Sequence, residues 1–316
     1  MEVRHFAAAD AAAWDSLVRA SWNGTPLHTR HFLSYHGQRF VDRSLVVLAD
    51  SGRLVGVFPA AQDPDYPERV VTHPGSTFGG LVQTGDLLGL EALEAIERIA
   101  STYAGFGYQV LRYKSVPLIY HRIPYHDDLY ALFRLGARRF RTDLCAAIDT
   151  SERLPLSRNR RAGIRHASAA GVSLDAGRHY LPAVWDILEW QLEERFGARP
   201  THTLAEIEDV ADRLGDAVCC RVAKINGQVV AGLVLFIMGR VVRAQYSAAN
   251  RSAREVSALD LLFDTVISDA QQNGFRYVDF GSSNTDEGRQ LNAGLYRYKT
   301  GLGAGSVAHD MYELAL

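Results

Sequence analysis

The chain has 316 residues, of which 47% are hydrophobic and 22% charged, and its formal net charge at pH 7 is −2. This composition predicts a folded globular protein and excludes a disordered one, and the near-neutral charge argues against a protein that mainly coats nucleic acid. The length exceeds that of most single compact cores and suits two domains. Three cysteines, Cys145, Cys219 and Cys220, lie in apolar runs, which favours buried free thiols over disulfides.

The N-terminal residues contain neither the basic region nor the apolar run of a signal peptide. The longest apolar stretch, residues 229–238, has the length of a strand and is too short to span a membrane. No cysteine or histidine spacing typical of a metal site occurs. We therefore expect a soluble cytoplasmic protein without membrane insertion and without a bound metal.

A hairpin is the first clear element of the chain. Residues 46–48 and 54–58 are apolar runs on either side of a polar turn at residues 50–52. A helical apolar face follows, formed by Leu93, Ile96 and Ala100. This helix is expected to end near Gly105, where a further strand begins.

An arginine-rich segment, residues 158–170, predicts a basic helix that joins the two halves of the chain. One interpretation is a solvated linker helix. The other is that its arginines contact phosphates of a substrate, for which the guanidinium offers a suitable fork of donors. The arginines concerned are Arg158, Arg160, Arg161 and Arg165.

The second half repeats the order of the first. Strands at residues 218–225 and 229–237 flank Asn226-Gly227, a dipeptide that favours a tight turn, and a third strand follows at 241–248. The next helix has an apolar face formed by Leu259, Leu262, Phe263, Val266 and Ala270. It is expected to end near Gly274, before another strand.

Short segments of the first half recur in the second half in the same order, at offsets between 169 and 174 residues. The pairs are Arg4-His5-Phe6 with Arg178-His179-Tyr180, Trp14-Asp15 with Trp185-Asp186, Pro26-Leu27-His28-Thr29 with Pro200-Thr201-His202-Thr203, and Gly105-Phe106-Gly107-Tyr108 with Gly274-Phe275-Arg276-Tyr277. Each half therefore reads strand, helix, helix, antiparallel strands, helix, strand. We predict two α/β domains, at residues 1–150 and 151–316.

The C-terminal region carries the most specific motifs. It reads Tyr-Val-Asp-Phe-Gly-Ser-Ser from Tyr277 and Tyr-Lys-Thr-Gly-Leu-Gly-Ala from Tyr298. With the glycine loop at residues 74–80 and the segment at 200–207, these motifs make nearly the whole chain resemble the tandem-GNAT, Fem-like acyltransferases. The resemblance implies an α/β (α+β) fold of two GNAT-like domains with mixed, largely antiparallel sheets flanked by helices. It also implies that the first domain is degenerate and the second catalytic.

The resemblance fails at one motif. GNAT enzymes usually carry glycines between their fourth strand and the next helix, where backbone amides hold the pyrophosphate of CoA. The corresponding residues 251–258 contain no glycine. Backbone amides can still point at a phosphate here, assisted by arginine side chains. The expected cofactor-binding residues are Arg251, Arg254, Glu255, Val256 and Ser257, and the expected co-substrate is acyl-CoA.

Acyl transfer of this type needs a neutral amine, a polarised thioester carbonyl and a leaving thiolate that can be protonated. We predict three catalytic residues: His202, Asp279 and Tyr246. Each also has a structural explanation. Thr203 and Glu206 form a capping-box pattern beside His202, Asp279 suits a buried carboxylate, and Tyr246 suits a core aromatic.

The predicted substrate contacts are polar residues of the same motifs and one acidic pair of the first half. They are Gln245, Ser282, Ser283, Asn292, Lys299 and Asp128. Asp127 and Asp128 are expected in a loop, where they could bind sugar hydroxyls. Turn formation would also explain the serines, and a position near a helix C-terminus would also explain Lys299.

The resemblance favours an N-acyltransferase that moves an acyl group from acyl-CoA to a small amine, with a nucleotide-linked amino sugar as one acceptor. A tRNA-dependent aminoacyl transferase acting on cell-wall precursors is the alternative, although the near-neutral charge speaks against a nucleic-acid partner. A third alternative is a non-catalytic binding protein that retains the fold. The partners expected are therefore small molecules, and the oligomeric state, a homodimer included, stays open.

Overall fold

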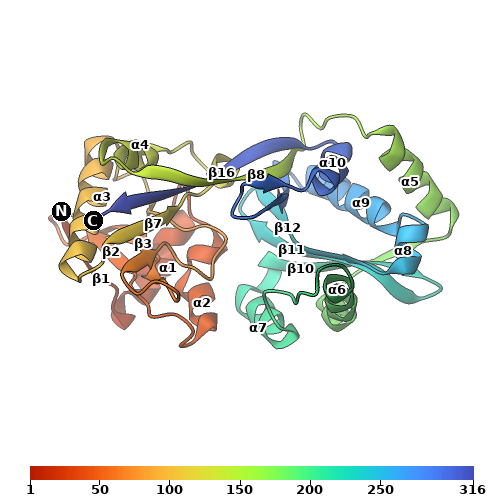
Figure 1. Ribbon diagram of the computed structural model, residues 1–316, viewed down its shortest axis with the longest axis horizontal. Coiled ribbons are helices and arrows are strands. Elements are labelled where there is room, and N and C mark those ends of the chain that lie inside the picture. The colour runs from red at the N-terminus through yellow and green to blue at the C-terminus, as the bar shows by residue number, and fades with distance from the viewer. The chain divides into compact units, whose positions relative to one another are not determined.

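The computed structural model covers residues 1–316 and describes all of them except the side chain of Phe196. The chain forms two compact units (Figure 1). Unit 1 comprises residues 1–143, 287–289 and 308–316, and unit 2 comprises residues 144–286 and 290–307. The expected boundary at residues 150/151 differs from this division because residues 144–149 pair with a strand of unit 2 and the C-terminal strand pairs with a strand of unit 1.

Unit 1 contains short strands and four α-helices. Its elements are β1 (Glu2–His5), α1 (Ala11–Ala20), α2 (Arg30–Leu33), β2 (Leu45–Leu48), β3 (Leu54–Phe58), β4 (Ala61–Gln62), β5 (Arg69–Val71), β6 (Val82–Gln83), α3 (Leu90–Gly105), β7 (Val110–Lys114) and α4 (Asp127–Arg134), with the start of β8 (Arg138–Asp149) and the end of β16 (Gly305–Ala315). One sheet has the order β1-β2-β3-β6, and β4, β5, β7 and β16 follow one another in a second. The predicted hairpin is confirmed as β2 and β3.

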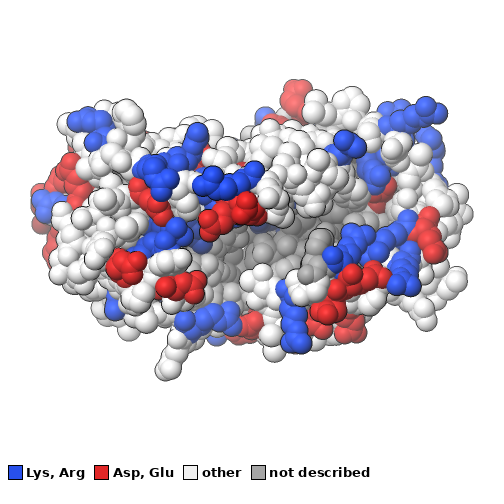
Figure 2. Space-filling view, in the orientation of Figure 1, with Lys and Arg blue, Asp and Glu red and all other residues white. Residues whose placement is uncertain are grey.

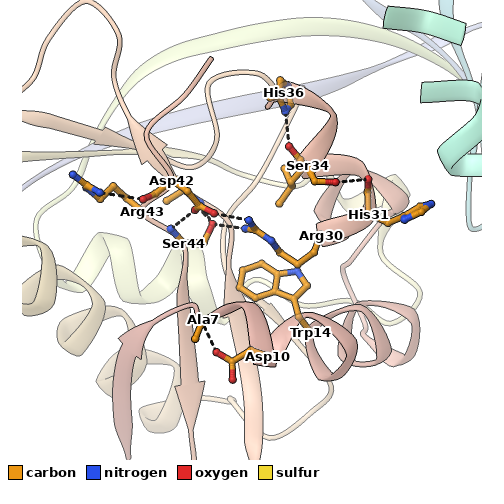
Figure 3. A network of polar contacts seen from close by, with 12 residues as sticks. Ala7, Asp10, Trp14, Arg30, His31, Ser34, His36, Asp42, Arg43 and Ser44 are labelled. Atoms are coloured by element: carbon orange, nitrogen blue, oxygen red, sulfur yellow. Dashed lines mark hydrogen bonds and ion pairs between the residues drawn. The ribbon is translucent and has the colours of Figure 1, made fainter. Parts of the chain in front are cut away.

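A polar network ties the first helices of unit 1 to the segment that enters β2 (Figure 3). The Arg30 guanidinium donates to the Ser44 hydroxyl at 3.0 Å and pairs with Asp42 at 2.5 Å. It also lies over the Phe6 ring, 4.0 Å from the ring centroid. Because one side chain satisfies several partners at once, the entry into α2 is fixed against the sheet.

Unit 2 has longer strands and a deeper core. Its elements are the end of β8, α5 (Arg158–Ala169), β9 (Ser173–Ala176), α6 (Leu181–Phe196), α7 (Leu204–Leu214), β10 (Val218–Ile225), β11 (Gln228–Met238), β12 (Val241–Ala249), α8 (Arg251–Glu255), α9 (Ala258–Gln272), β13 (Tyr277–Ser282), β14 (Asn284–Thr285), β15 (Gln290–Leu291), α10 (Ala293–Gly301) and the start of β16. The sheet order is β8-β13-β12-β11-β10-β9. The basic helix predicted after residue 158 is confirmed as α5.

The sheet of unit 2 is covered by helices on both faces (Figure 1). On one face, α9 contributes Leu262, Phe263 and Val266 to the core. On the other face α6 approaches β11 so closely that a Cβ added at Gly232 would lie 2.2 Å from a methyl group of Val184. Only glycine permits this approach, and the burial of these apolar faces supplies the main stabilisation of the unit.

Three of the four sequence repeats fall on equivalent elements. Trp14 of α1 and Trp185 of α6 are both buried, and Thr29 and Thr203 cap α2 and α7 respectively. The fourth pair does not match, because Arg4 and His5 lie in strand β1 whereas residues 178–180 form a 3-10 turn. That part of the repeat prediction is wrong. The strand of unit 2 that corresponds in order to β1 is β9, which begins five residues before Arg178 and ends at Ala176.

The prediction of a loop at Asp127 and Asp128 is also wrong. Both residues lie in the first turn of α4, and Asp128 is buried in the core of unit 1. The Tyr113 hydroxyl donates to its carboxylate at 2.5 Å. Burial raises the pKa of Asp128 to about 6. A sugar contact by this residue stays a prediction, and its surroundings are those of a core carboxyl.

Replacing Asp128 with asparagine tests this assignment. The folded state holds the Asp128 proton more tightly than the unfolded state, so the stability that it contributes is present below the unfolded pKa and is lost as the pH rises through about 6. The unfolding free energy of Asp128→Asn minus that of wild type should therefore be about 2 kcal/mol larger at pH 7.5 than at pH 4.5. Urea unfolding at both pH values measures the difference, and a pH-independent difference would contradict the buried assignment.

Candidate active site

The central feature of unit 2 is the point where two neighbouring strands separate. β12 and β13 pair in parallel only from Val241 with Tyr277 to Arg243 with Asp279, although β12 continues to Ala249. On its other edge, β12 pairs with β11 through a bulge at Gln245, since Ala244 and Tyr246 face consecutive residues of β11. Unpaired backbone at such a bulge is available to a ligand.

A buried ion pair marks this separation. The Arg243 guanidinium and the Asp279 carboxylate are 2.5 Å apart, and Asp279 is 1% exposed. The other carboxylate oxygen accepts the amide of Gly281 at 2.8 Å. Arg243 also donates to the Gln245 side chain at 3.1 Å. Asp279 therefore has the contacts of a positioning group, and its role as a proton acceptor stays a prediction.

Lys299 lies at the same place and is buried, whereas the sequence also suited a surface lysine. Its ammonium group donates to the carbonyl oxygens of Gly281 at 3.0 Å and of Ser282 at 2.6 Å. Burial lowers its pKa to about 8, and the nearby Asp279 carboxylate opposes that shift. Lys299 thus fixes the end of β13 from α10.

Three further predicted substrate contacts lie at or after the end of β13: Ser282, Ser283 and Asn292. The Ser282 hydroxyl accepts the amide of Asn284 at 3.0 Å, which forms a local turn. The Ser283 hydroxyl is buried, and the described residues offer it no hydrogen-bond partner. Asn292 caps α10, since its side chain accepts the amide of Leu295 at 3.0 Å. Ser283 is therefore the serine with spare hydrogen-bonding capacity, and Asn292 has a structural function.

Two predicted catalytic residues contact one another. The capping box of Thr203 and Glu206 starts α7, and it places His202 so that its Nδ1 forms a hydrogen bond with the Tyr246 hydroxyl. The Trp185 ring packs edge-on against Tyr246, with centroids 5.0 Å apart. Burial raises the pKa of Tyr246 to about 12, so the phenol is neutral at physiological pH and can act as a proton donor.

A pocket of about 370 Å³ opens where β12 and β13 have separated, between the end of β12, the start of α9, and α10. It is lined by Arg160, Gln191, Arg195, Ser247, Ala249, Ala253, Arg254, Ser257, Leu259, Asp260, Leu295 and Tyr298. Three arginines thus face one aspartate. A pocket of this charge favours an anionic ligand.

The predicted cofactor-binding residues divide into two groups. Arg254 and Ser257 line the pocket. Arg251 lies outside the pocket lining and pairs with Glu194 at 2.6 Å, Glu255 is exposed, and Val256 packs against the core of unit 2. In place of a glycine loop, the chain forms the short helix α8 and then Ser257 with a φ of +61°, immediately before α9.

The pocket also contains residues that the sequence did not single out, among them Arg195 and Asp260. Asp260 gave only a weak signal in the sequence: it lies beside the apolar face predicted from Leu259 to Ala270, where an acid is rarely buried. Arg195 lies near the C-terminal end of α6 and belongs to no motif that the sequence offered.

Lys299 provides a test of the site's electrostatics. The unfolded state binds the Lys299 proton more tightly than the folded state, so stability should rise with pH between about 8 and 10. Over pH 7.5 to 9.5, the unfolding free energy of wild type should rise by about 2 kcal/mol relative to Lys299→Met. Denaturant titrations at the two pH values measure this difference. Equal pH dependences of wild type and Lys299→Met would show that the Lys299 ammonium is solvated.

In the residues whose placement is described, no helix is both long and apolar enough to cross a membrane. The same residues contain no group of three or more histidine, cysteine, aspartate or glutamate side chains that could hold a metal ion.

Comparisons with known proteins identify the family of the chain. Residues 130–300, more than half of the chain, match the family described as Acetyltransferase (GNAT) domain. The comparison with curated proteins gave no match.

Among solved structures, FemX is similar with a TM-score of 0.73 and 15% identity, covering 100% of this chain and 98% of FemX. L-PGS from Bacillus licheniformis is similar with a TM-score of 0.59 and 14% identity, covering 89% and 85% of the two chains. A tandem GNAT protein from the clavulanic acid biosynthesis pathway gives a TM-score of 0.51 and 13% identity, with 99% and 98% covered. These likenesses confirm the predicted α/β fold, and the family match makes the conclusion specific: the chain belongs to the GNAT acetyltransferase family and is an acyltransferase.

Proposed function

We propose that this chain transfers an acyl group from acyl-CoA to the amine of a small acceptor, and that unit 2 carries the reaction. The observation on which the proposal rests is the separation of β12 from β13 beside the bulge at Gln245. Backbone amides at this position can polarise a thioester carbonyl. The donor's nucleotide end would then lie in the pocket that Arg254 and Ser257 line.

His202 and Tyr246 suit the proton transfers of this reaction because they share a hydrogen bond. The amine nitrogen attacks the thioester carbon, so that an N–C bond forms and the C–S bond breaks. The amine proton passes to His202, directly or through water. Tyr246 gives its proton to the leaving sulfur and recovers one from His202, so that protons and charge balance over the reaction.

Unit 1 is proposed as the degenerate copy. Its counterpart of His202 is His28, whose Nδ1 accepts the Thr25 amide at 3.0 Å and whose Nε2 contacts the Gly79 carbonyl oxygen at 3.3 Å. Burial lowers the pKa of His28 to about 4. Because both ring nitrogens are engaged with the backbone, His28 supports the fold and is unsuited to proton transfer.

An aminoacyl-tRNA donor is the second candidate function. The glycine-free segment from Arg251 to Ser257 favours it, as do the fold likenesses to FemX and L-PGS. Against it, basic and acidic side chains are interspersed on the face shown in Figure 2, whereas a tRNA partner calls for a continuous basic surface. We therefore favour small-molecule partners, with a nucleotide-linked amino sugar as the acceptor, in the cytoplasm where acyl-CoA occurs.

The donor can be identified by thermal shift. Acetyl-CoA or a longer acyl-CoA at 100 times its Kd should add about 2.7 kcal/mol to stability and raise the Tm by several degrees. A CCA-ended trinucleotide at equal concentration serves as the mimic of a tRNA end. A shift with the trinucleotide and none with any acyl-CoA would reject the CoA donor in favour of the second candidate.

Tyr246→Phe tests the proton donor. It removes one hydroxyl while keeping the contact with Trp185, so kcat with acyl-CoA should fall about 100-fold with little change in KM. An acyl thioester with a more acidic thiol should recover part of the loss because its thiolate needs no proton to leave. Tyr277→Phe, at the paired end of β13, is the matched control and should retain activity. Equal losses with both donors would contradict the assignment.

A further inference from the structure

The pocket beyond the strand separation lacks the glycine loop that GNAT enzymes usually carry for phosphate, and arginines line it instead. They come from three different helices: Arg160 from α5, Arg195 from α6 and Arg254 from α8. Guanidinium groups can replace amides because each presents several N–H donors in a fork that matches phosphate oxygens.

Arg160 is held in place on two sides. Its guanidinium donates to the Asp260 carboxylate at 2.6 Å and lies over the Tyr298 ring, 4.7 Å from the centroid. Asp260 is 2% exposed, so the pair is anchored in the core of unit 2. A cation fixed in this way loses little conformational entropy when it binds a phosphate.

Arg254 and Arg251 form a natural comparison on α8. Both pair with Glu194, at 3.5 Å and 2.6 Å, and both lie over the Trp190 ring, at 5.1 Å and 5.7 Å. Only Arg254 lines the pocket. Its Nη2 group is buried, and within the described part of the chain it has no hydrogen-bond partner. The protein therefore leaves hydrogen-bonding capacity of Arg254 unused.

We propose that Arg160, Arg195 and Arg254 together bind the phosphates of the donor's nucleotide, in place of glycine-loop amides, and that Asp260 positions Arg160. This inference rests on the proposed function and specifies how its donor is held. The ligand chemistry is a phosphorylated adenosine, which occurs both in CoA and at the 3′ end of tRNA. Leu259 and Leu295, which also line the pocket, offer apolar surface to the base.

The test is calorimetric titration with adenosine 3′,5′-bisphosphate, the nucleotide part of CoA. Arg254→Gln and Arg195→Gln should each weaken binding about 10- to 100-fold, the effect of losing a charged hydrogen bond. Arg251→Gln is the matched control and should change Kd by less than about twofold. If Arg251→Gln weakens binding as much as Arg254→Gln, or if no variant does, the inference is overturned.

Arg160 is tested with a substitution that keeps the charge, because loss of its guanidinium charge would leave the Asp260 carboxylate buried and unpaired. Arg160→Lys keeps the charge and loses the fork, and should weaken binding several-fold. Asp260→Asn should weaken it in the same direction while Arg160→Lys adds little further loss, since both changes act through one guanidinium. Additive losses would show that Asp260 does not act through Arg160. A thermal melt of each variant identifies any that fails to fold.

The same titration with a CCA trinucleotide separates this inference from the proposed function. Wild type that binds the trinucleotide and not the bisphosphate, with Arg254→Gln affected and Arg251→Gln unaffected, would support the arginines and reject the CoA donor. Turnover of acyl-CoA with no selective effect of the arginine variants would retain the function and reject the inference. Wild type that binds neither ligand would overturn the inference.

Discussion

The buried pair of Arg243 and Asp279 is the constraint on which the site depends. It lies at the last paired position of β12 and β13, and it holds the strands together just before they separate. Lys299 fixes the turn after β13 from the other side. Because Arg243 and Asp279 form a buried ion pair and the buried Lys299 ammonium is held by backbone carbonyls, the opening beyond them has a defined shape, which a positioning mechanism requires.

From this opening, the site extends in two directions. Toward α7, the bulge at Gln245 leads to the contact of Tyr246 with His202. Toward α9, it leads to a pocket whose three arginines face one aspartate. One end thus suits proton transfer and the other suits phosphate, in the order in which a thioester and its nucleotide would lie along an extended CoA.

Local patterns in the sequence predicted the hairpins and the basic helix α5, because each depends on periodicity or a short motif. The resemblance to the tandem-GNAT acyltransferases implied the fold. They could not place β16 in unit 1, since that strand pairs with β7 about 200 residues earlier. Likewise, the sequence does not distinguish Arg251 from Arg254. They differ in the folded chain because only Arg254 lies on the side of α8 that lines the pocket. Lys299 could be named from its motif, but its burial depends on the fold of β13.

Hydrogen–deuterium exchange with a non-hydrolysable acyl-CoA analogue tests the central claim, that the separation of β12 and β13 holds the donor. We predict that the analogue slows exchange in peptides from residues 243–260 and 279–299 and leaves the peptides of β2 and β3 in unit 1 unchanged. Protection confined to unit 1, or none in unit 2 under saturating analogue, would contradict the account.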